Sequence, residues 1–134
     1  MTEDKFRAQV VKRARELGWK AMFIGRSKGG DRHVTQMGAD GRGWPDLTLV
    51  RERIVFAELK TDANYHVYEP EREWLAQLRL AGGEVYLWRP RLWPEIEETL
   101  RHRDPDRWKR ILGAADGDAQ QAAAVQRMLA AVGQ

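Results

Sequence analysis

The chain has 134 residues, no cysteine, a formal net charge of +3 and a pI of about 9.4. This length fits one domain with a core of its own, and 43% hydrophobic with 32% charged residues indicates a folded protein rather than a disordered one. The lack of cysteine excludes disulfides and thiolate metal sites, and neither a membrane-spanning run nor a signal peptide is recognisable. We therefore expect a cytoplasmic protein with no membrane partner. The mild basic charge is compatible with a polyanionic partner but does not by itself indicate one.

An amphipathic helix is predicted over residues 2–17, with Thr2 as its N-cap and Gly18 as its stop. Its apolar residues recur at intervals of three or four and are Phe6, Val10, Ala14 and Leu17. Glu3 falls in the first turn, where the helix dipole favours an acid, and on the face that leads into the core.

A strand is predicted over residues 19–24, followed by a glycine-rich segment over 25–43. The basic residues of that segment are Arg26, Lys28, Arg32, His33 and Arg42. Its backbone and its basic side chains could close on phosphates, but a solvated connector explains the composition equally well. A lone loop histidine such as His33 is more often a surface residue than a metal ligand.

A β-hairpin is predicted from two apolar runs, 47–50 and 54–59, separated by the charged triplet 51–53. If Asp46 stands opposite Glu58, the loop has about three residues and one face of the hairpin is wholly apolar. That face carries Leu47, Leu49, Val55, Ala57 and Leu59. Lys60, two residues beyond Glu58, then shares its face.

This register brings together two carboxylates and an ammonium group. Like charges directly opposite on a sheet repel by roughly 0.2 to 1 kcal/mol. A hard divalent cation offsets that repulsion, because Mg²⁺ takes oxygen ligands and is commonly held by one or two carboxylates. Asp46 and Glu58 are therefore candidate metal ligands, and Lys60 is placed to act on a metal-bound water or on a phosphate.

The next elements are a loop over 61–68, a helix over 70–81 and a strand over 84–88. Strand, helix and strand in this order form a βαβ unit, so we expect the strands at 54–60 and 84–88 to be parallel. The polar and aromatic loop residues, among them His66, could contact sugar and phosphate or stack on an unpaired base, although a plain turn explains them nearly as well. Trp74 fits the apolar stripe of the helix and is expected to be a core residue.

The last part of the chain gives weaker signals. A short helix is predicted from Trp93 to about residue 100. Residues 101–112 are either a basic helix near DNA or a solvated helix over the core, and we favour the second. Residues 118–132 contain good helix formers with few large anchors, so this tail either packs on a partner subunit or frays.

The sequence Pro45-Asp46, followed by Glu58-Leu59-Lys60, resembles the metal-dependent nuclease signature PD-(D/E)xK of restriction endonucleases and archaeal Holliday junction resolvases. With Gly43, Thr61 and the Trp74-Leu75 pair it is most similar to the virus-type replication and repair nuclease (VRR-NUC) family. The resemblance covers about 90 of the 134 residues, because it ends after the Trp-Arg-Pro-x-x-Trp stretch at 88–93.

The resemblance implies an α/β fold with a core of helix, three strands, helix and strand, built around a mixed sheet. We expect a nuclease core at 1–94 and a C-terminal helical extension of the same domain at 95–134. The implied metal is Mg²⁺ or Mn²⁺, held by Asp46, Glu58, the Leu59 carbonyl and, in addition, Glu3, with Lys60 catalytic. Glu71 stands where the family usually has glutamine and is a candidate supporting residue. The candidate DNA contacts are Arg26, Lys28, Arg32, Arg42 and His66.

The implied function is a metal-dependent DNA endonuclease that acts in DNA repair on branched DNA or Holliday junctions, in a bacterial or phage-infected cell. Paired cuts in a junction need two sites, so we expect a homodimer. A nonspecific nicking nuclease, a noncatalytic DNA-binding module and an RNA-processing or protein-interaction domain remain open alternatives.

Overall fold

The structure is a computed structural model, and it describes residues 1–24, 38–106, 120, 123–124, 126–127 and 130. The described helices are α1 (Glu3–Glu16), α2 (Glu69–Leu80), the 3₁₀ turn η1 (Pro90–Leu92) and α3 (Trp93–Arg101). The described strands are β1 (Lys20–Phe23), β2 (Leu47–Val50), β3 (Ile54–Leu59) and β4 (Glu84–Trp88). Up to residue 101, both the order and the type of the predicted elements are confirmed, with element ends displaced by about one residue. The predictions for 101–112 and 118–132 lie largely outside the described residues.

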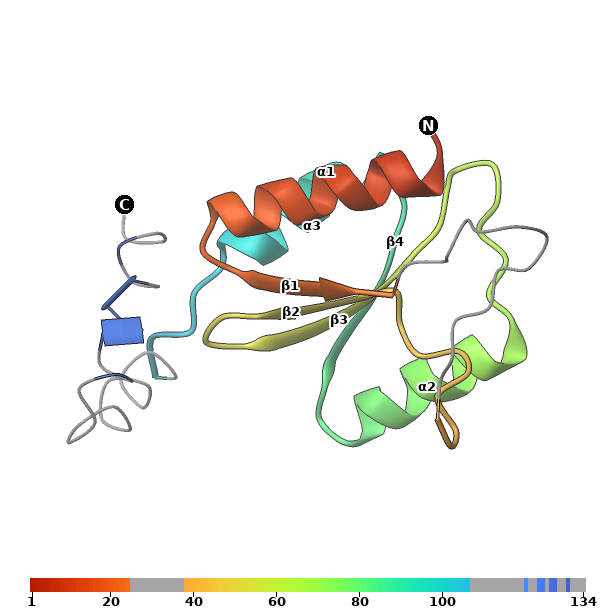
Figure 1. Cartoon of the computed structure of the whole chain (residues 1–134). Coiled ribbons are helices and arrows are strands. Elements are labelled where there is room, and N and C mark those ends of the chain that lie inside the picture. The colour runs from red at the N-terminus through yellow and green to blue at the C-terminus, as the bar shows by residue number, and fades with distance from the viewer. Residues whose placement is uncertain (25–37, 107–119, 121–122, 125, 128–129, 131–134) are drawn as a thin grey trace.

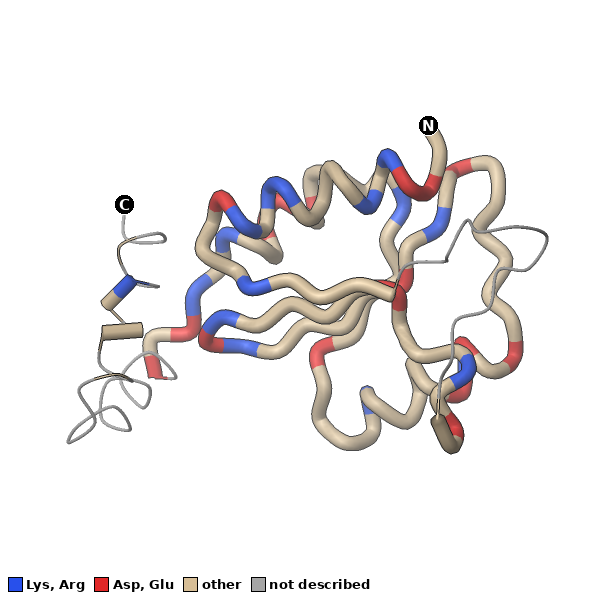
Figure 2. Tube along the Cα trace, viewed as in Figure 1, with Lys and Arg blue, Asp and Glu red and all other residues tan. Residues whose placement is uncertain are grey.

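The strands form one mixed sheet in the order β1-β2-β3-β4. The first two pairings are antiparallel, and β3 pairs with β4 in parallel, as the βαβ order predicts. In the hairpin, Leu47 pairs with Ala57 and Val50 pairs with Ile54, which is the predicted register. The register puts the charged triplet in the loop and keeps charge out of the middle of both strands, so that charged residues gather at the hairpin's two ends (Figure 2).

The sheet lies between helices, with α1 and α3 over one face and α2 over the other (Figure 1). The apolar face of the hairpin packs under α1 and α3, and the predicted apolar set is fully buried there. The core also takes Ile96 and Leu100 from α3. The predicted boundary between core and extension at residue 94 falls inside α3. This helix covers the sheet and belongs to the core.

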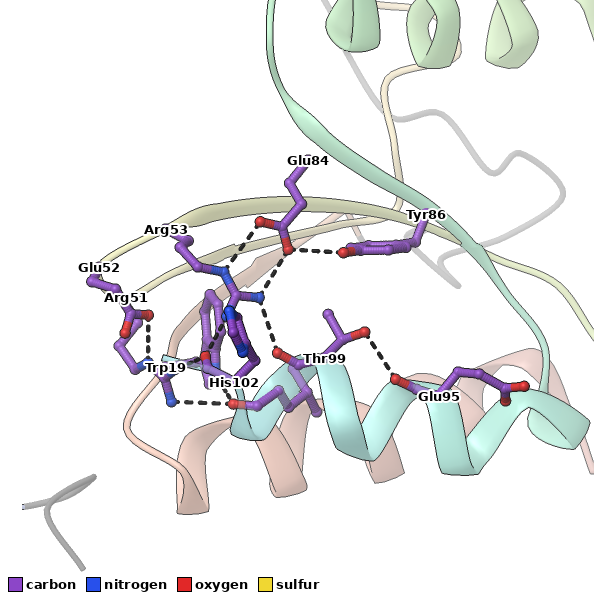
Figure 3. Close-up of polar contacts among 10 residues, drawn as sticks. Trp19, Arg51, Glu52, Arg53, Glu84, Tyr86, Glu95, Thr99 and His102 are labelled. Carbon is purple, nitrogen blue, oxygen red and sulfur yellow. Dashed lines mark hydrogen bonds and ion pairs between the residues drawn. The ribbon is translucent and has the colours of Figure 1, made fainter. Parts of the chain in front are cut away.

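The hairpin loop is buried, which its sequence did not indicate. Arg51, Glu52 and Arg53 are each no more than 7% exposed. The Arg51 Nε donates to the Glu52 carboxylate at 2.8 Å, and Arg53 forms an ion pair with Glu84 at 2.8 Å (Figure 3). A charged triplet in a short loop usually points to solvent, and here it fills the end of the core.

Both guanidinium groups satisfy carbonyl oxygens at the C-terminal end of α3. Arg51 donates to the carbonyls of Leu100 and His102, and Arg53 donates to those of Thr99 and His102 (Figure 3). These carbonyl oxygens accept no hydrogen bond within the helix. They form the negative end of the helix dipole, where a positive charge is stabilised. The ring of Trp19 lies 4.5 Å and 5.1 Å from the two guanidinium carbons and completes the packing.

Among the residues that the structure describes, no helix is long and apolar enough to cross a membrane.

Replacing Arg51 with alanine should destabilise the fold strongly. The change leaves Glu52 buried without its cation and removes the Arg51 donor from the Leu17 carbonyl. Breaking a buried pair in this way costs about 3–5 kcal/mol. Urea unfolding measures the change. The matched control is Arg101→Ala, which breaks the exposed pair with Glu97 and should cost no more than about 1 kcal/mol. Equal urea midpoints for the two variants would contradict the role assigned to the buried loop.

Candidate active site

Asp46 and Glu58 meet where β2 begins and β3 ends. Because Leu47 pairs with Ala57, the two acids are the next facing positions in the ladder. The backbone N–H of Asp46 donates to Glu58 Oε1 at 3.1 Å, and the Leu59 N–H donates to Asp46 Oδ2 at 2.9 Å. Each carboxylate is thus held by a backbone group of the opposite strand, and the predicted pairing of the two acids is confirmed.

Glu58 is the buried member of the pair, at 1% exposure. Its Oε2 accepts no hydrogen bond, and the nearest cation is the Lys60 Nζ at 3.9 Å. Burial raises the pKa of Glu58 to about 11, and the nearby carboxyl groups of Glu71 and Asp46 raise it further. The surroundings of Glu58 therefore favour its protonated form as long as no metal ion is bound.

Lys60 is paired with Glu71 of α2. Its Nζ lies 3.1 and 3.2 Å from the two carboxylate oxygens of Glu71, and the same carboxylate accepts the Tyr68 N–H at 2.8 Å. Burial raises the pKa of Glu71, but hydrogen bonds with Glu58, the Tyr68 amide and Lys60 outweigh it and hold that pKa below its ordinary value. Glu71 is thus a carboxylate that fixes the lysine and closes the first turn of α2.

Asp46, Lys60 and Glu71 line a hollow of about 580 Å³ at the end of the sheet, and Glu58 is not among its lining residues. Its lining combines the start of α1, the end of the hairpin, the following loop and the first turn of α2. The lining residues are Thr2, Glu3, Asp4, Arg7, Ile24, Asp46, Lys60, Asn64, Tyr68 and Glu71. The volume lies within the range of small-ligand sites, and both acidic and basic groups face it.

The turn before Asp46 is docked on α2. Gly43 has a φ of +89°, and a Cβ built there would lie 2.5 Å from the carbonyl carbon of Pro70. The Trp74 indole N–H donates to the carbonyls of Asp40 and Arg42 at 2.9 and 3.1 Å. Trp74 was predicted to be a core residue; it is instead half-buried and anchors the turn that leads into the acidic pair.

The predicted site residues fall into three groups. Asp46, Glu58, Lys60 and Glu71 come together, and Glu3 lines the same hollow from α1. Arg42 and His66 are exposed and line neighbouring hollows. The third group, Arg26, Lys28, Arg32 and His33, lies outside the described residues.

The site also contains Arg7, which sequence reasoning did not select, and Tyr68, one of the aromatic loop residues for which a contact with sugar, phosphate or base was considered. Arg7 lines the hollow one turn after Glu3, and its guanidinium carbon lies 4.5 Å from the ring centre of Phe23. Tyr68 precedes the helix-starting Pro70 and lines the same hollow. The sequence signals available were the helical spacing of Arg7 from Glu3 and the position of Tyr68 just before the helix.

The donor set fits a hard divalent cation held by two carboxylates. No group of three or more His, Asp or Glu in the described ranges is arranged to hold a metal. Mg²⁺ needs only one or two carboxylates, since it keeps several waters. The buried Glu58 Oε2 without a hydrogen-bond partner is an oxygen that a cation would satisfy, and a nearby cation would favour the ionised form of Glu58.

Comparison of the chain with family models, curated proteins and solved structures found no match.

Replacing Glu58 with glutamine should change how stability depends on pH. A carboxyl whose pKa is raised on folding stabilises the fold below its unfolded pKa, and this stabilisation is lost as pH rises toward the folded pKa. In EDTA, the urea midpoint of the wild type should therefore fall between pH 5 and 9 more steeply than that of Glu58→Gln. The difference at pH 8 should be about 1–3 kcal/mol in favour of the variant.

Two comparisons complete that test. Mg²⁺ should restore the wild type at pH 8 and leave Glu58→Gln almost unchanged, because only a bound ligand stabilises by mass action. The exposed acid Glu73, changed to glutamine, should follow the wild type. Parallel pH profiles for wild type and Glu58→Gln would show that Glu58 is already ionised without a cation.

Replacing Gly43 with alanine should destabilise the chain and displace the acidic pair. The control is Gly82→Ala, since Gly82 has a similar φ of +91° but no atom within 4 Å of the point that a Cβ would occupy. Gly82→Ala should cost about 1 kcal/mol from backbone strain alone, and Gly43→Ala about 1–3 kcal/mol more from the clash with Pro70. Thermal unfolding gives both values, and equal losses would mean that the turn does not depend on its close approach to α2.

Proposed function

We propose that this chain is a metal-dependent DNA endonuclease of the PD-(D/E)xK type, similar to the VRR-NUC family. The observation that supports the proposal most directly is that Asp46 and Lys60 line one hollow, while the buried Glu58 pairs with Asp46 across the ends of two strands and lies 3.9 Å from the Lys60 Nζ. The signature residues are separated in sequence, and a chance occurrence of the motif would not require them to meet. The mixed sheet with helices on both faces agrees with the fold that the resemblance implies.

Asp46 and Glu58, with the Leu59 carbonyl as a further oxygen, would hold Mg²⁺ or Mn²⁺, and Glu3 is near enough to the hollow to assist. When bound, the cation supplies positive charge against the phosphate and lowers the pKa of a coordinated water. Lys60 orients the attacking water and stabilises the negative charge that builds on the phosphate oxygens. Water attacks phosphorus, the bond to the 3′ oxygen breaks, and the product carries a 5′-phosphate.

Glu71 acts as a positioning residue in this scheme. It contacts Lys60 through both carboxylate oxygens and is itself fixed by the Tyr68 amide. The lysine is therefore held at the edge of the hollow with its rotamer settled before substrate arrives. Such preorganisation lowers the cost of placing a charge at the transition state.

For the substrate we propose branched DNA, with a Holliday junction as the leading candidate and a homodimer as the acting form. A nuclease without structure selectivity shares the same site. A noncatalytic DNA-binding module is the second candidate, in which the Lys60–Glu71 ion pair has a structural role and does not position a catalytic group.

The decisive experiment compares wild type, Asp46→Ala and Lys60→Ala on a labelled four-way junction and its matched linear duplex, with Mg²⁺, Mn²⁺ or EDTA. Each variant should lose at least about 100-fold in cleavage rate, since each removes a group that acts on the transition state. DNA binding should be largely retained. The exposed Lys20 on β1, changed to alanine, is the matched control and should cleave as the wild type does.

The outcomes separate the candidates. Paired, metal-dependent cuts confined to the junction indicate a dimeric resolvase, and equal cutting of both DNAs indicates a nonselective nuclease. Binding without cleavage in any metal supports the noncatalytic module. Undiminished cleavage by Asp46→Ala or Lys60→Ala would refute the assignment of the site.

A further inference from the structure

Two exposed tyrosines lie in the loop between β3 and α2. They adjoin the hollow of about 580 Å³ that Asp46 and Lys60 line, which we call the catalytic hollow. Tyr65 is 57% exposed and Tyr68 is 58% exposed, although both are large side chains with apolar rings. This loop passes close to the start of α1 before it enters α2 (Figure 1). Solvent-exposed aromatic groups next to a polar site are typical of a binding site for a ligand with an apolar face.

The hollow continues into a second one along this loop. Asn64 lines both the catalytic hollow and a neighbouring hollow of about 510 Å³. The residues of the second hollow are Ala63, Asn64, Tyr65, His66, Val67 and Arg72. A ligand longer than one nucleotide unit that extends from the carboxylates past Asn64 would therefore reach Tyr65 in the second hollow.

A positively charged side chain lies over the ring of each tyrosine. The Arg89 guanidinium carbon lies 4.7 Å from the centre of the Tyr65 ring, and the Lys60 Nζ lies 5.5 Å from that of Tyr68. His66 packs edge-on against Tyr68, with ring centres 4.6 Å apart. The rings are thus held by neighbours while more than half of each side chain stays accessible. Alternating aromatic and basic groups match a nucleic acid strand, which presents bases and phosphates in turn.

We propose that Tyr68 and Tyr65 form a stacking platform for unpaired bases of the strand whose phosphate enters the catalytic hollow. This inference rests on the proposed nuclease function and specifies its substrate: DNA that is single-stranded next to the cleaved bond. A continuous duplex cannot use the platform, because its base faces are covered by neighbouring pairs. Branch points and flaps supply unpaired bases beside a duplex.

The first test measures binding without cleavage. A fluorescein-labelled twelve-nucleotide oligothymidylate and a blunt duplex of equal length are titrated with protein in EDTA. Tyr68→Ala and Tyr65→Ala should each weaken binding of the single strand roughly 5- to 100-fold, because base stacking on an aromatic side chain contributes that much. Tyr68→Phe should bind as the wild type does, and binding of the duplex should change less than twofold in every variant.

A matched control removes an exposed apolar side chain elsewhere. Leu80, at the end of α2, is 84% exposed, and Leu80→Ala should bind both DNAs normally. Thermal unfolding of each variant identifies any loss of binding that follows from misfolding.

The second test removes the bases from the DNA. An oligonucleotide of abasic residues keeps the phosphates but offers nothing to stack, so it should bind the wild type weakly, and Tyr68→Ala should not weaken it further. A purely structural role for Tyr68 would lower the affinity for abasic and normal strands equally. That result, or an equal loss of affinity for duplex DNA, would overturn the proposal of a stacking platform.

The two proposals fail separately. If the tyrosine variants bind single strands normally while the wild type still cleaves branched DNA, the platform is wrong and the nuclease stands. If no DNA is cleaved in any metal but the tyrosine-dependent, base-dependent binding is present, the nuclease assignment is wrong and the platform belongs to a DNA-binding module.

Discussion

The site depends on the two hydrogen bonds that cross the end of the hairpin between Asp46 and β3. One runs from the Asp46 N–H to the Glu58 carboxylate, and the other from the Leu59 N–H to the Asp46 carboxylate. They bring two acids together, although like charges at facing positions repel. The donors are backbone groups fixed by the ladder, so the carboxylates cannot separate without losing at least one of these two hydrogen bonds. The register therefore determines where the acidic pair forms.

The opposite end of the same hairpin is fixed by Arg51 and Arg53. Their guanidinium groups satisfy carbonyls at the end of α3 (Figure 3). Arg51 also donates to the Leu17 carbonyl just after α1. One end of the hairpin thus holds the candidate site residues Asp46 and Glu58. The arginines at its other end connect α1 and α3 to the sheet by hydrogen bonds. A slip of one residue would expose the apolar face and would break the hydrogen bonds between the arginines and their carbonyls. Both the apolar face and these hydrogen bonds therefore specify the register.

The strands, their register and the acidic pair could be predicted because they follow from alternation and from the apolar face that one register alone produces. The burial of residues 51–53 could not, since a charged triplet in a short loop has the same pattern whether it faces water or helix ends. The Lys60–Glu71 pair needs the position of α2 relative to the sheet, which periodicity does not give. The exposure of Tyr65 and Tyr68 likewise depends on how the loop is laid across the site.

In the proposed reaction, the charges around the hollow make the entry of the substrate phosphate depend on a bound cation. Asp46, Glu71 and Glu3 face a space that a phosphate would enter, and Lys60 is already paired with one of them. An anionic strand meets net repulsion there until a divalent cation is present, because charge at short range outweighs the screened attraction of distant surface cations. Stacking on aromatic rings does not depend on that charge. A strand held by its bases beside the acids would thus reach the site before the cation neutralises it, and the cation would then draw in the phosphate.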